Sequence, residues 1–223
     1  MEQAPRQRLA RAKQECGSGN AALMTQLRIY ATQASGMTAG RASAARPRLS
    51  TSNPALISAE LKTRGIKFQR WPSQPGLEQG ANQEQILLAY QSLIRSVQES
   101  DGYGTVDVMR VGGDQPSSEP LRQTFLRVHQ HAEDEVRFFV EGRGLFSLHI
   151  KGEVLQLTCE ANDWIVIPAE TRHWFDMGAS PSYCVIRFYK KSGGWAASFT
   201  DDPIANHYPG LAQTSKQTIQ PID

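Results

Sequence analysis

Two short stretches decide how this chain folds: HQHAEDE at residues 129–135 and PAETRH at residues 168–173. His129 and His131 are two residues apart, so in a β-strand both imidazoles leave the same face. Glu135 keeps that parity, and His173 is expected on a strand that pairs back against the first. Three imidazole nitrogens and one carboxylate that converge in this way predict a site for a divalent transition metal such as Fe, Ni or Zn.

The combination of residues, rather than any one histidine, supports a metal site. An isolated histidine is more often a core or surface residue, and a His-x-His pair alone is weak evidence. Here three of the five histidines fall in one pattern, with Gly142 seven residues after Glu135 and Pro168 five residues before His173. Four protein ligands leave two positions open on an ion that prefers six, and open positions are typical of a catalytic site.

Apolar segments around these motifs predict a β-barrel over about residues 126–192. Each is short, alternates in polarity and ends at turn-forming residues, as expected for antiparallel strands. Gly142 and Gly144 are predicted to flank one turn. A barrel of this kind encloses a cavity lined by alternate residues of each strand. The expected strands are 136–140, 145–150, 154–159, 164–167 and 183–189.

The chain before the barrel predicts peripheral helices and additional strands. The clearest helix is 83–99, where apolar residues recur at helical spacing and Asn82 with Gln85 imitates a capping box. Such an apolar stripe is expected to pack on a sheet. The other expected helices are 54–64 and 118–125, and the other expected strands are 24–31, 66–71 and 103–111.

Composition favours one domain, residues 24–211, between a basic extension at 1–23 and a polar tail at 212–223. We interpret the extension as disordered or as the product of a misassigned start; an Arg-rich transit peptide is the alternative. Residues 49–223 carry 16 basic and 20 acidic side chains, so they lack the excess of positive charge that binding to nucleic acid requires. No apolar run approaches the length of a membrane span.

The three cysteines do not make a disulfide framework. Cys159 and Cys184 fall inside apolar strand patterns and are expected to be buried thiols. Buried free thiols suit the reducing cytoplasm. We therefore expect a cytoplasmic protein, acting as a monomer, with neither a nucleic-acid nor a membrane partner.

Three segments carry a resemblance to a known family: HAEDEVRFFVEGRGLFSLHI (131–150), IPAETRHWFDMG (167–178) and GWAASFTDDPIANHYPGL (194–211). In general they resemble the two motifs of the cupin superfamily, whose antiparallel β-barrel (a double-stranded β-helix) holds a central metal. More narrowly, they resemble acireductone dioxygenase, and the resemblance extends loosely back to about Met24. Gln123 and Asn162 stand where glycines often open the motifs, and Glu170 replaces the usual glycine after Pro168.

The resemblance implies a dioxygenase of methionine salvage that oxidises 1,2-dihydroxy-3-keto-5-methylthiopentene with O2. One Fe(2+) or Ni(2+) per protomer would be bound by His129, His131, Glu135 and His173. Iron would give formate and 4-methylthio-2-oxobutanoate, and nickel would give formate, CO and 3-methylthiopropanoate. The alternatives are another cupin dioxygenase or isomerase, and a non-catalytic metal-binding cupin.

Strand parity extends the candidate site beyond the ligands. Arg137 and Phe139 are expected to face inward with Glu135, whereas Val136 and Phe138 face outward. The resemblance implies that Arg137 holds the anionic substrate; a structural ion pair with Glu135 or Asp134 is the alternative. Glu135 is the candidate proton acceptor, if it serves as metal ligand and base in turn.

Further substrate contacts are expected from Arg187 and from aromatic residues that could form an apolar wall. Aromatic residues in a barrel are more often plain core, which is the alternative for this wall. His149 is expected to be structural, and His207 is given no role. The wall residues are Phe125, Phe139, Phe175 and Trp195.

Overall fold

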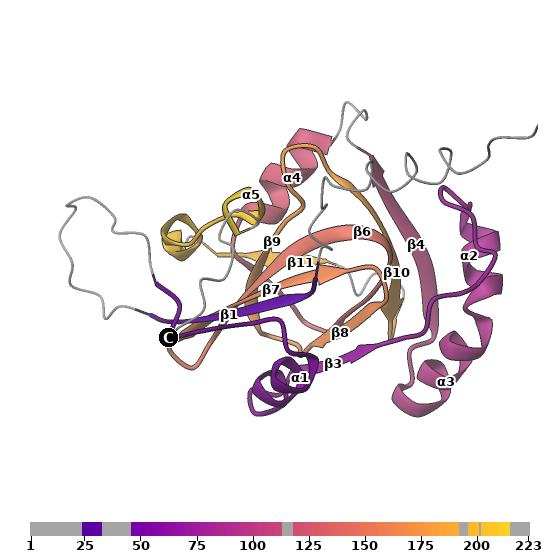
Figure 1. The fold of residues 1–223 in the computed structure, drawn as a ribbon, viewed down its shortest axis with the longest axis horizontal. Helices are drawn as coiled ribbons and strands as arrows, with labels where there is room; N and C mark the ends of the chain where they lie inside the picture. Colours follow the sequence, from indigo (N-terminus) through magenta and orange to yellow (C-terminus); the bar gives the residue numbers. More distant parts are fainter. Residues whose placement is uncertain (1–23, 33–45, 113–117, 192–195, 201, 215–223) are drawn as a thin grey trace, which may run out of the picture.

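The computed structural model describes residues 24–32, 46–112, 118–191, 196–200 and 202–214. These residues form an antiparallel β-barrel with a few short helices outside it, which confirms the predicted fold class (Figure 1). The predicted extension 1–23 lies outside the described residues. No helix within the described ranges is long and apolar enough to cross a membrane.

Eleven strands of the described chain belong to one hydrogen-bonded sheet system. The strands are β1 (Gln26–Ala31), β2 (Leu49–Thr51), β3 (Lys67–Arg70), β4 (Thr105–Gly112), β5 (His129–His131), β6 (Glu135–Ile150), β7 (Glu153–Glu160), β8 (Asp163–Ile167), β9 (Arg172–Asp176), β10 (Ser182–Tyr189) and β11 (Ala197–Phe199). The helices are α1 (Pro54–Lys62), α2 (Gln83–Ala89), α3 (Gln91–Asp101), α4 (Ser118–Leu126), the 3-10 helix η1 (Pro203–His207) and α5 (Leu211–Thr214).

Strand β6 joins the two halves of the barrel. Its first half pairs with β8 and β10, and its second half pairs with β7 and β9. The prediction of two strands separated by a turn at Gly142 and Gly144 was therefore wrong. The pairing with β10 shifts between Cys184 and Val185, so the glycines accompany a bulge that bends one continuous strand.

The two faces of β6 pack against different clusters. Phe139, Phe146 and Leu148 belong to the cluster inside the barrel. Val136 and Phe138 face away from it, as predicted, but they are fully buried beneath the outer helices. In Figure 1 these helices, α2 and α3, lie beside β4 on one side of the barrel.

The predicted helix 83–99 is two helices that meet at Tyr90, whose φ of −99° and ψ of 12° are not helical. The predicted capping box is present, because the side chains of Asn82 and Gln85 each accept the other's backbone N–H. Four residues of the predicted apolar stripe, Ile86, Tyr90, Ile94 and Val97, are buried, and Leu87 and Leu93 are partly buried. At the break, the Tyr90 ring packs edge-on against Phe138 with centroids 4.8 Å apart, a long-range contact that helical periodicity does not reveal.

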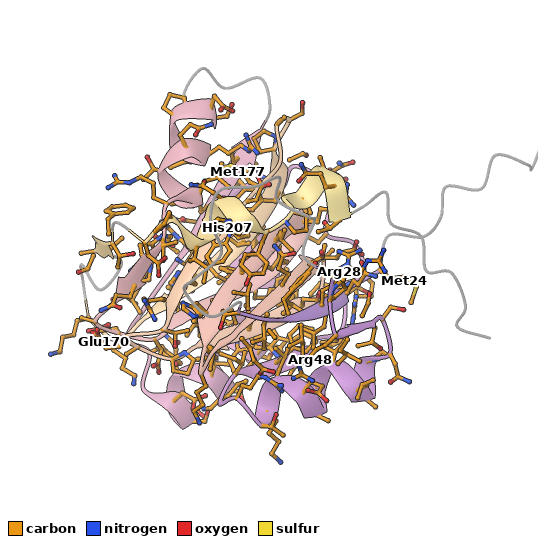
Figure 2. The ribbon with its side chains drawn as sticks, turned by 90° about the vertical axis from the view of Figure 1, so that its left-hand side faces the viewer. Met24, Arg28, Arg48, Glu170, Met177 and His207 are labelled. Carbon is orange, nitrogen blue, oxygen red and sulfur yellow. The ribbon has the colours of Figure 1, made fainter. Side chains whose placement is uncertain are left out.

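The ends of the described chain pack against each other. Arg28 of β1, which Figure 2 labels, is buried. Its Nη2 donates to the Thr214 carbonyl over 2.6 Å. Leu211 and Thr214 of α5 are buried too, so the folded part extends past the predicted boundary at residue 211. The prediction for Cys159 and Cys184 is confirmed, because both are buried free thiols.

Replacing Gly142 by alanine should destabilise the barrel. Its φ is +71°, and an added Cβ would lie 1.9 Å from the Ser182 carbonyl oxygen. The strained backbone and the clash together should cost about 2–4 kcal/mol of unfolding free energy. Gly112→Ala in β4 is the matched control, since among the described residues other than its chain neighbours no atom would lie within 4 Å of its Cβ. Equal urea midpoints for the two variants would contradict this account of the bulge.

Candidate metal centre

Three neighbouring strands carry the predicted ligands. His129 and His131 lie on β5, and His173 lies directly opposite His129 on β9. The ligand nitrogens of these histidines all lie within 4.8 Å of one another. Glu135, at the start of β6, places Oε2 2.7 Å from His173 Nε2 and 3.8 Å from His131 Nε2. The structure therefore brings the four predicted residues together, and it contains a histidine triad able to bind a metal.

Each histidine is oriented by a backbone carbonyl. The Nδ1 atoms of the three rings lie 2.7–3.1 Å from the carbonyl oxygens of Arg127, Thr171 and Ala196. A carbonyl can only accept a hydrogen bond, so Nδ1 carries the proton in every ring. In a neutral imidazole the other nitrogen then has a free lone pair. All three Nε2 atoms are thereby prepared as metal ligands, with their rings held in place.

The environment keeps the ligands in the protonation states that a metal needs. Burial lowers the pKa of His129 to about 4, and the neighbouring His173 adds to this effect. Burial also lowers the pKa of His131. Burial acts to raise the pKa of Glu135, but the positive charge of Arg137 opposes it, and that pKa lies well below its usual value. At neutral pH, His129 and His131 are therefore neutral and the carboxylate is ionised.

A bound cation would explain why Glu135 Oε2 and His173 Nε2 lie so close together. Glu135 Oε2 and His173 Nε2 are buried, and within the described chain neither makes a hydrogen bond of good geometry. With the proton on Nδ1, two electron-rich atoms face each other at 2.7 Å. Ligands at right angles around one six-coordinate ion, with bonds of about 2.0–2.1 Å, lie about 2.9 Å from each other. The donor set and its spacing therefore fit a divalent metal.

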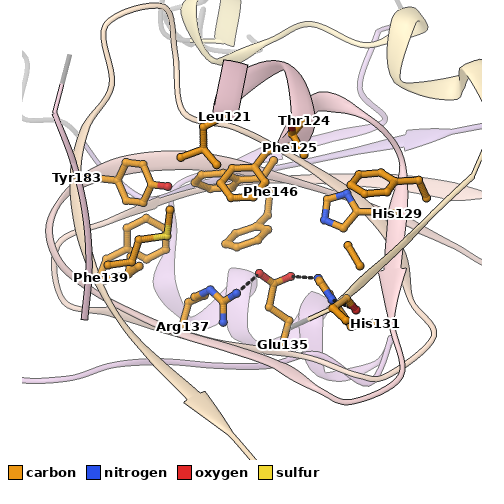
Figure 3. A pocket seen from close by; sticks show the side chains of 16 residues that line it. Leu121, Thr124, Phe125, His129, His131, Glu135, Arg137, Phe139, Phe146 and Tyr183 are labelled. Carbon is orange, nitrogen blue, oxygen red and sulfur yellow. Dashed lines mark hydrogen bonds and ion pairs between the residues drawn. The ribbon is translucent and has the colours of Figure 1, made fainter. Parts of the chain in front are cut away.

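A cavity of about 550 Å³ opens beside these residues. Arg137, Glu135 and His131 lie along one side of it and His129 lies next to them, whereas most of the remaining lining residues are apolar, with Thr124 and Tyr183 as exceptions (Figure 3). The other lining residues are Met109, Leu121, Thr124, Phe125, Phe139, Phe146, Phe175, Tyr183, Val185, Ala196, Ala197 and Phe199.

Only some of the residues predicted to bind the substrate line the cavity. Arg137 lines the cavity, and its Nη2 lies 2.8 Å from Glu135 Oε1, so the ion pair considered as an alternative exists as well. Phe125, Phe139 and Phe175 also line the cavity. Arg187 is not among the lining residues; its Nε and Nη2 each bond to Asp107 over 2.7 Å. Trp195 lies outside the described residues.

Several lining residues were missed in the sequence. Tyr183 and Val185 share a strand face with Arg187, so the parity rule could have found them. Phe146 follows the bulge, where simple alternation from Glu135 no longer applies. Phe199 reaches the cavity because β11 pairs with β5, with Phe199 opposite His129. No local pattern signals that pairing.

An antiparallel barrel with a histidine triad and a carboxylate beside an internal cavity defines a metal-binding protein of the cupin type. The family model described as the ARD/ARD' family matches residues 41–197, and the chain belongs to this family. It is an enzyme, an oxidoreductase of the dioxygenase class.

Curated relatives and a solved structure agree with this assignment. A protein of Synechococcus sp. (strain CC9311) named acireductone dioxygenase is 73% identical over 88% of this chain and 100% of its own length. One from Synechococcus sp. (strain RCC307), with the same name, is 54% identical over 74% of this chain and 89% of its own. The structure of an acireductone dioxygenase from Bacillus anthracis, with a cadmium ion in its active center, superimposes with a TM-score of 0.65. That match is 26% identical and covers 80% of this chain and 100% of the other.

Replacing His129 or His173 by alanine should abolish metal loading, because each change removes one prepared lone pair. The wild-type protein should hold about one divalent metal per protomer by elemental analysis. His149→Ala is the matched control, since His149 lies on β6 but is not part of the triad. Full metal content in His129→Ala and His173→Ala would disprove the site.

Proposed function

We propose that this enzyme oxidises the acireductone 1,2-dihydroxy-3-keto-5-methylthiopentene with O2, as a step of methionine salvage. One observation carries the proposal: two different walls face the same cavity. We call them the ionic wall (His129, His131, Glu135 and Arg137) and the apolar wall (Phe125, Phe139 and Phe175). An enediol that ionises needs the first, and a methylthio-alkyl tail needs the second. Membership of the ARD/ARD' family and the names of the curated relatives support the same substrate.

We further propose Fe(2+) or Ni(2+) as the metal, held by His129, His131, Glu135 and His173. When bound, it supplies a Lewis acid and a template for an oxygen chelate of the substrate. Imidazole and carboxylate ligands accept both ions, so the ligand types do not exclude either one. The carbonyl-bound Nδ1 atoms support this ligand set, because they direct every Nε2 toward the same point.

Arg137 is proposed to hold the negative charge of the ionised enediol. Its side chain is 14% exposed and belongs to the ionic wall beside Glu135. A guanidinium is charged at any working pH and offers several N–H donors in a fixed plane. Nη1 donates a hydrogen bond to Val136 O, and Nη2 forms an ion pair with Glu135 Oε1 at 2.8 Å, which together fix the group in the cavity wall. The remaining N–H bonds can then donate to a substrate oxygen.

Glu135 is proposed to take part in proton transfer as well as metal binding. Its two oxygens differ, because Oε1 is held by Arg137 whereas Oε2 faces the histidines. Its lowered pKa keeps the carboxylate ionised, so Oε2 is available to accept a proton from an acidic group. An enediol conjugated to a ketone is such a group.

The apolar wall is proposed to receive the methylthio tail. Phe125, Phe139 and Phe175 line the cavity away from the ionic groups, and the Phe125 and Phe175 rings meet edge to face at 6.3 Å. Burying the tail there would remove apolar surface from water and fix the enediol end toward the ligands. Trp195 is proposed as a further part of this wall.

A cytoplasmic location is also proposed. Cys159 and Cys184 are buried and free, and neither takes part in a disulfide. Free thiols in a stable core suit a reducing compartment.

Arg137→Ala should keep the fold but lose most activity. Removing a charge-assisted contact to an anion costs roughly 1.5–3 kcal/mol, or about one to two powers of ten in kcat/KM. Turnover should be normalised to metal content, because Arg137 also contacts the ligand Glu135. Unchanged kcat/KM per metal would reduce Arg137 to its ion pair with Glu135.

The identity of the metal should select the products. Apo-protein reconstituted separately with Fe(2+) and Ni(2+) should consume O2 with the acireductone in both cases. Formate and 4-methylthio-2-oxobutanoate are expected with iron, and formate, CO and 3-methylthiopropanoate with nickel. The measurement is product analysis together with an O2 electrode. Lack of O2 consumption in both forms would refute the proposed substrate, and one shared product mixture would refute selection by the metal.

A further inference from the structure

Two arginines occupy directly opposite positions on neighbouring strands, and one of them, Arg137, lines the cavity. Arg187 of β10 lies directly opposite Arg137 of β6. Like charges in directly opposite cross-strand positions destabilise a sheet. The arrangement therefore needs a compensating group, since Arg137 must also keep donors available for an anionic ligand.

Asp107 compensates the charge of Arg187. It lies directly opposite Arg187 on the next strand, β4, and accepts two hydrogen bonds of 2.7 Å from it. This is the bidentate geometry in which arginine binds carboxylates most strongly. Arg187 is thus neutralised and held toward β4, which leaves Arg137 as the only arginine or lysine among the described residues that line the cavity.

Tyr189 connects the two guanidinium groups. It is two residues after Arg187, so both side chains leave the same face of β10. The guanidinium carbons of Arg137 and Arg187 lie over its ring, 5.8 and 5.6 Å from the centroid. Both distances allow a cation–π attraction. Tyr189 is only 6% exposed, and its buried hydroxyl has no hydrogen-bond partner among the described residues. The ring, rather than the hydroxyl, therefore makes the contact.

We propose that Tyr189 and Asp107 are positioning residues that act on the substrate through Arg137. The Tyr189 ring holds the Arg137 guanidinium in the cavity wall, and Asp107 keeps Arg187 from repelling or replacing it. The inference rests on the proposed function, in which Arg137 contacts the ionised enediol. Neither residue is placed in contact with the substrate or the metal.

The test is a double-mutant cycle in the metal-loaded enzyme, with kcat/KM normalised to metal content. Tyr189→Leu removes the ring and should lower kcat/KM roughly threefold to tenfold. Tyr189→Phe keeps the ring and should restore the wild-type value. In the Arg137→Ala background, Tyr189→Leu should cause no further loss. Tyr30→Leu is the matched control, because it removes a buried ring that packs on Tyr208 instead of on an arginine.

Asp107→Asn keeps the inference testable if Tyr189→Leu folds poorly. Asp107 is at a partly exposed position, and asparagine has nearly the same shape. This variant should also lower kcat/KM at unchanged metal content and add nothing to Arg137→Ala.

Each contrary outcome has a separate meaning. Wild-type kcat/KM in Tyr189→Leu and Asp107→Asn, with Arg137→Ala impaired, would overturn the inference. Losses that add to that of Arg137→Ala would also overturn it, because the residues would then act independently. A Tyr189→Phe variant as impaired as Tyr189→Leu would overturn the role of the ring. Normal activity in Arg137→Ala would instead refute the proposed role of Arg137 itself.

Discussion

The centre depends on three hydrogen bonds from histidine Nδ1 to backbone carbonyls. Two of these carbonyls, from Arg127 and Thr171, lie two residues before the histidine that they orient. The third belongs to Ala196, next to β11, so His131 is oriented by a strand far away in the sequence. Because these bonds fix the proton on Nδ1, the Nε2 lone pairs face one another in a buried pocket. That arrangement is unfavourable until a cation joins them.

The cavity beside this centre depends on the bend in β6. The strand starts at Glu135 with the ionic wall and continues to Phe146, which lines the apolar part. At Gly144 an added Cβ would lie 2.1 Å from the Phe175 ring, so a side chain there would displace that ring. The same glycine-containing segment thus bends the strand and makes room for an aromatic wall. Ionic and apolar surfaces come together because one strand supplies residues to both.

The sequence predicted what depends on local spacing. Parity within each strand was enough to pair His129 with His131 on β5 and Glu135 with Arg137 on β6, and Asn82 with Gln85 was enough to start a helix. The sequence could not join the two pairs by parity, because residues 132–134 separate β5 from β6. It did not predict the fate of Gly142 and Gly144, because glycine serves bulges as well as turns. Nor did it predict how Tyr90 interrupts a helix, how Asp107 pairs with Arg187, or how Phe199 reaches the cavity. Those features arise from partners distant in the sequence.

The most direct test of the account is the position of the metal. Crystals of nickel-loaded protein should show one anomalous peak per protomer, within about 2.0–2.2 Å of the Nε2 atoms of His129, His131 and His173 and of one Glu135 oxygen. The three Nδ1 atoms should still lie within hydrogen-bond distance of their carbonyls. A peak elsewhere, or a metal bound through Nδ1 with these carbonyl contacts broken, would contradict the claim that the backbone prepares the ligands.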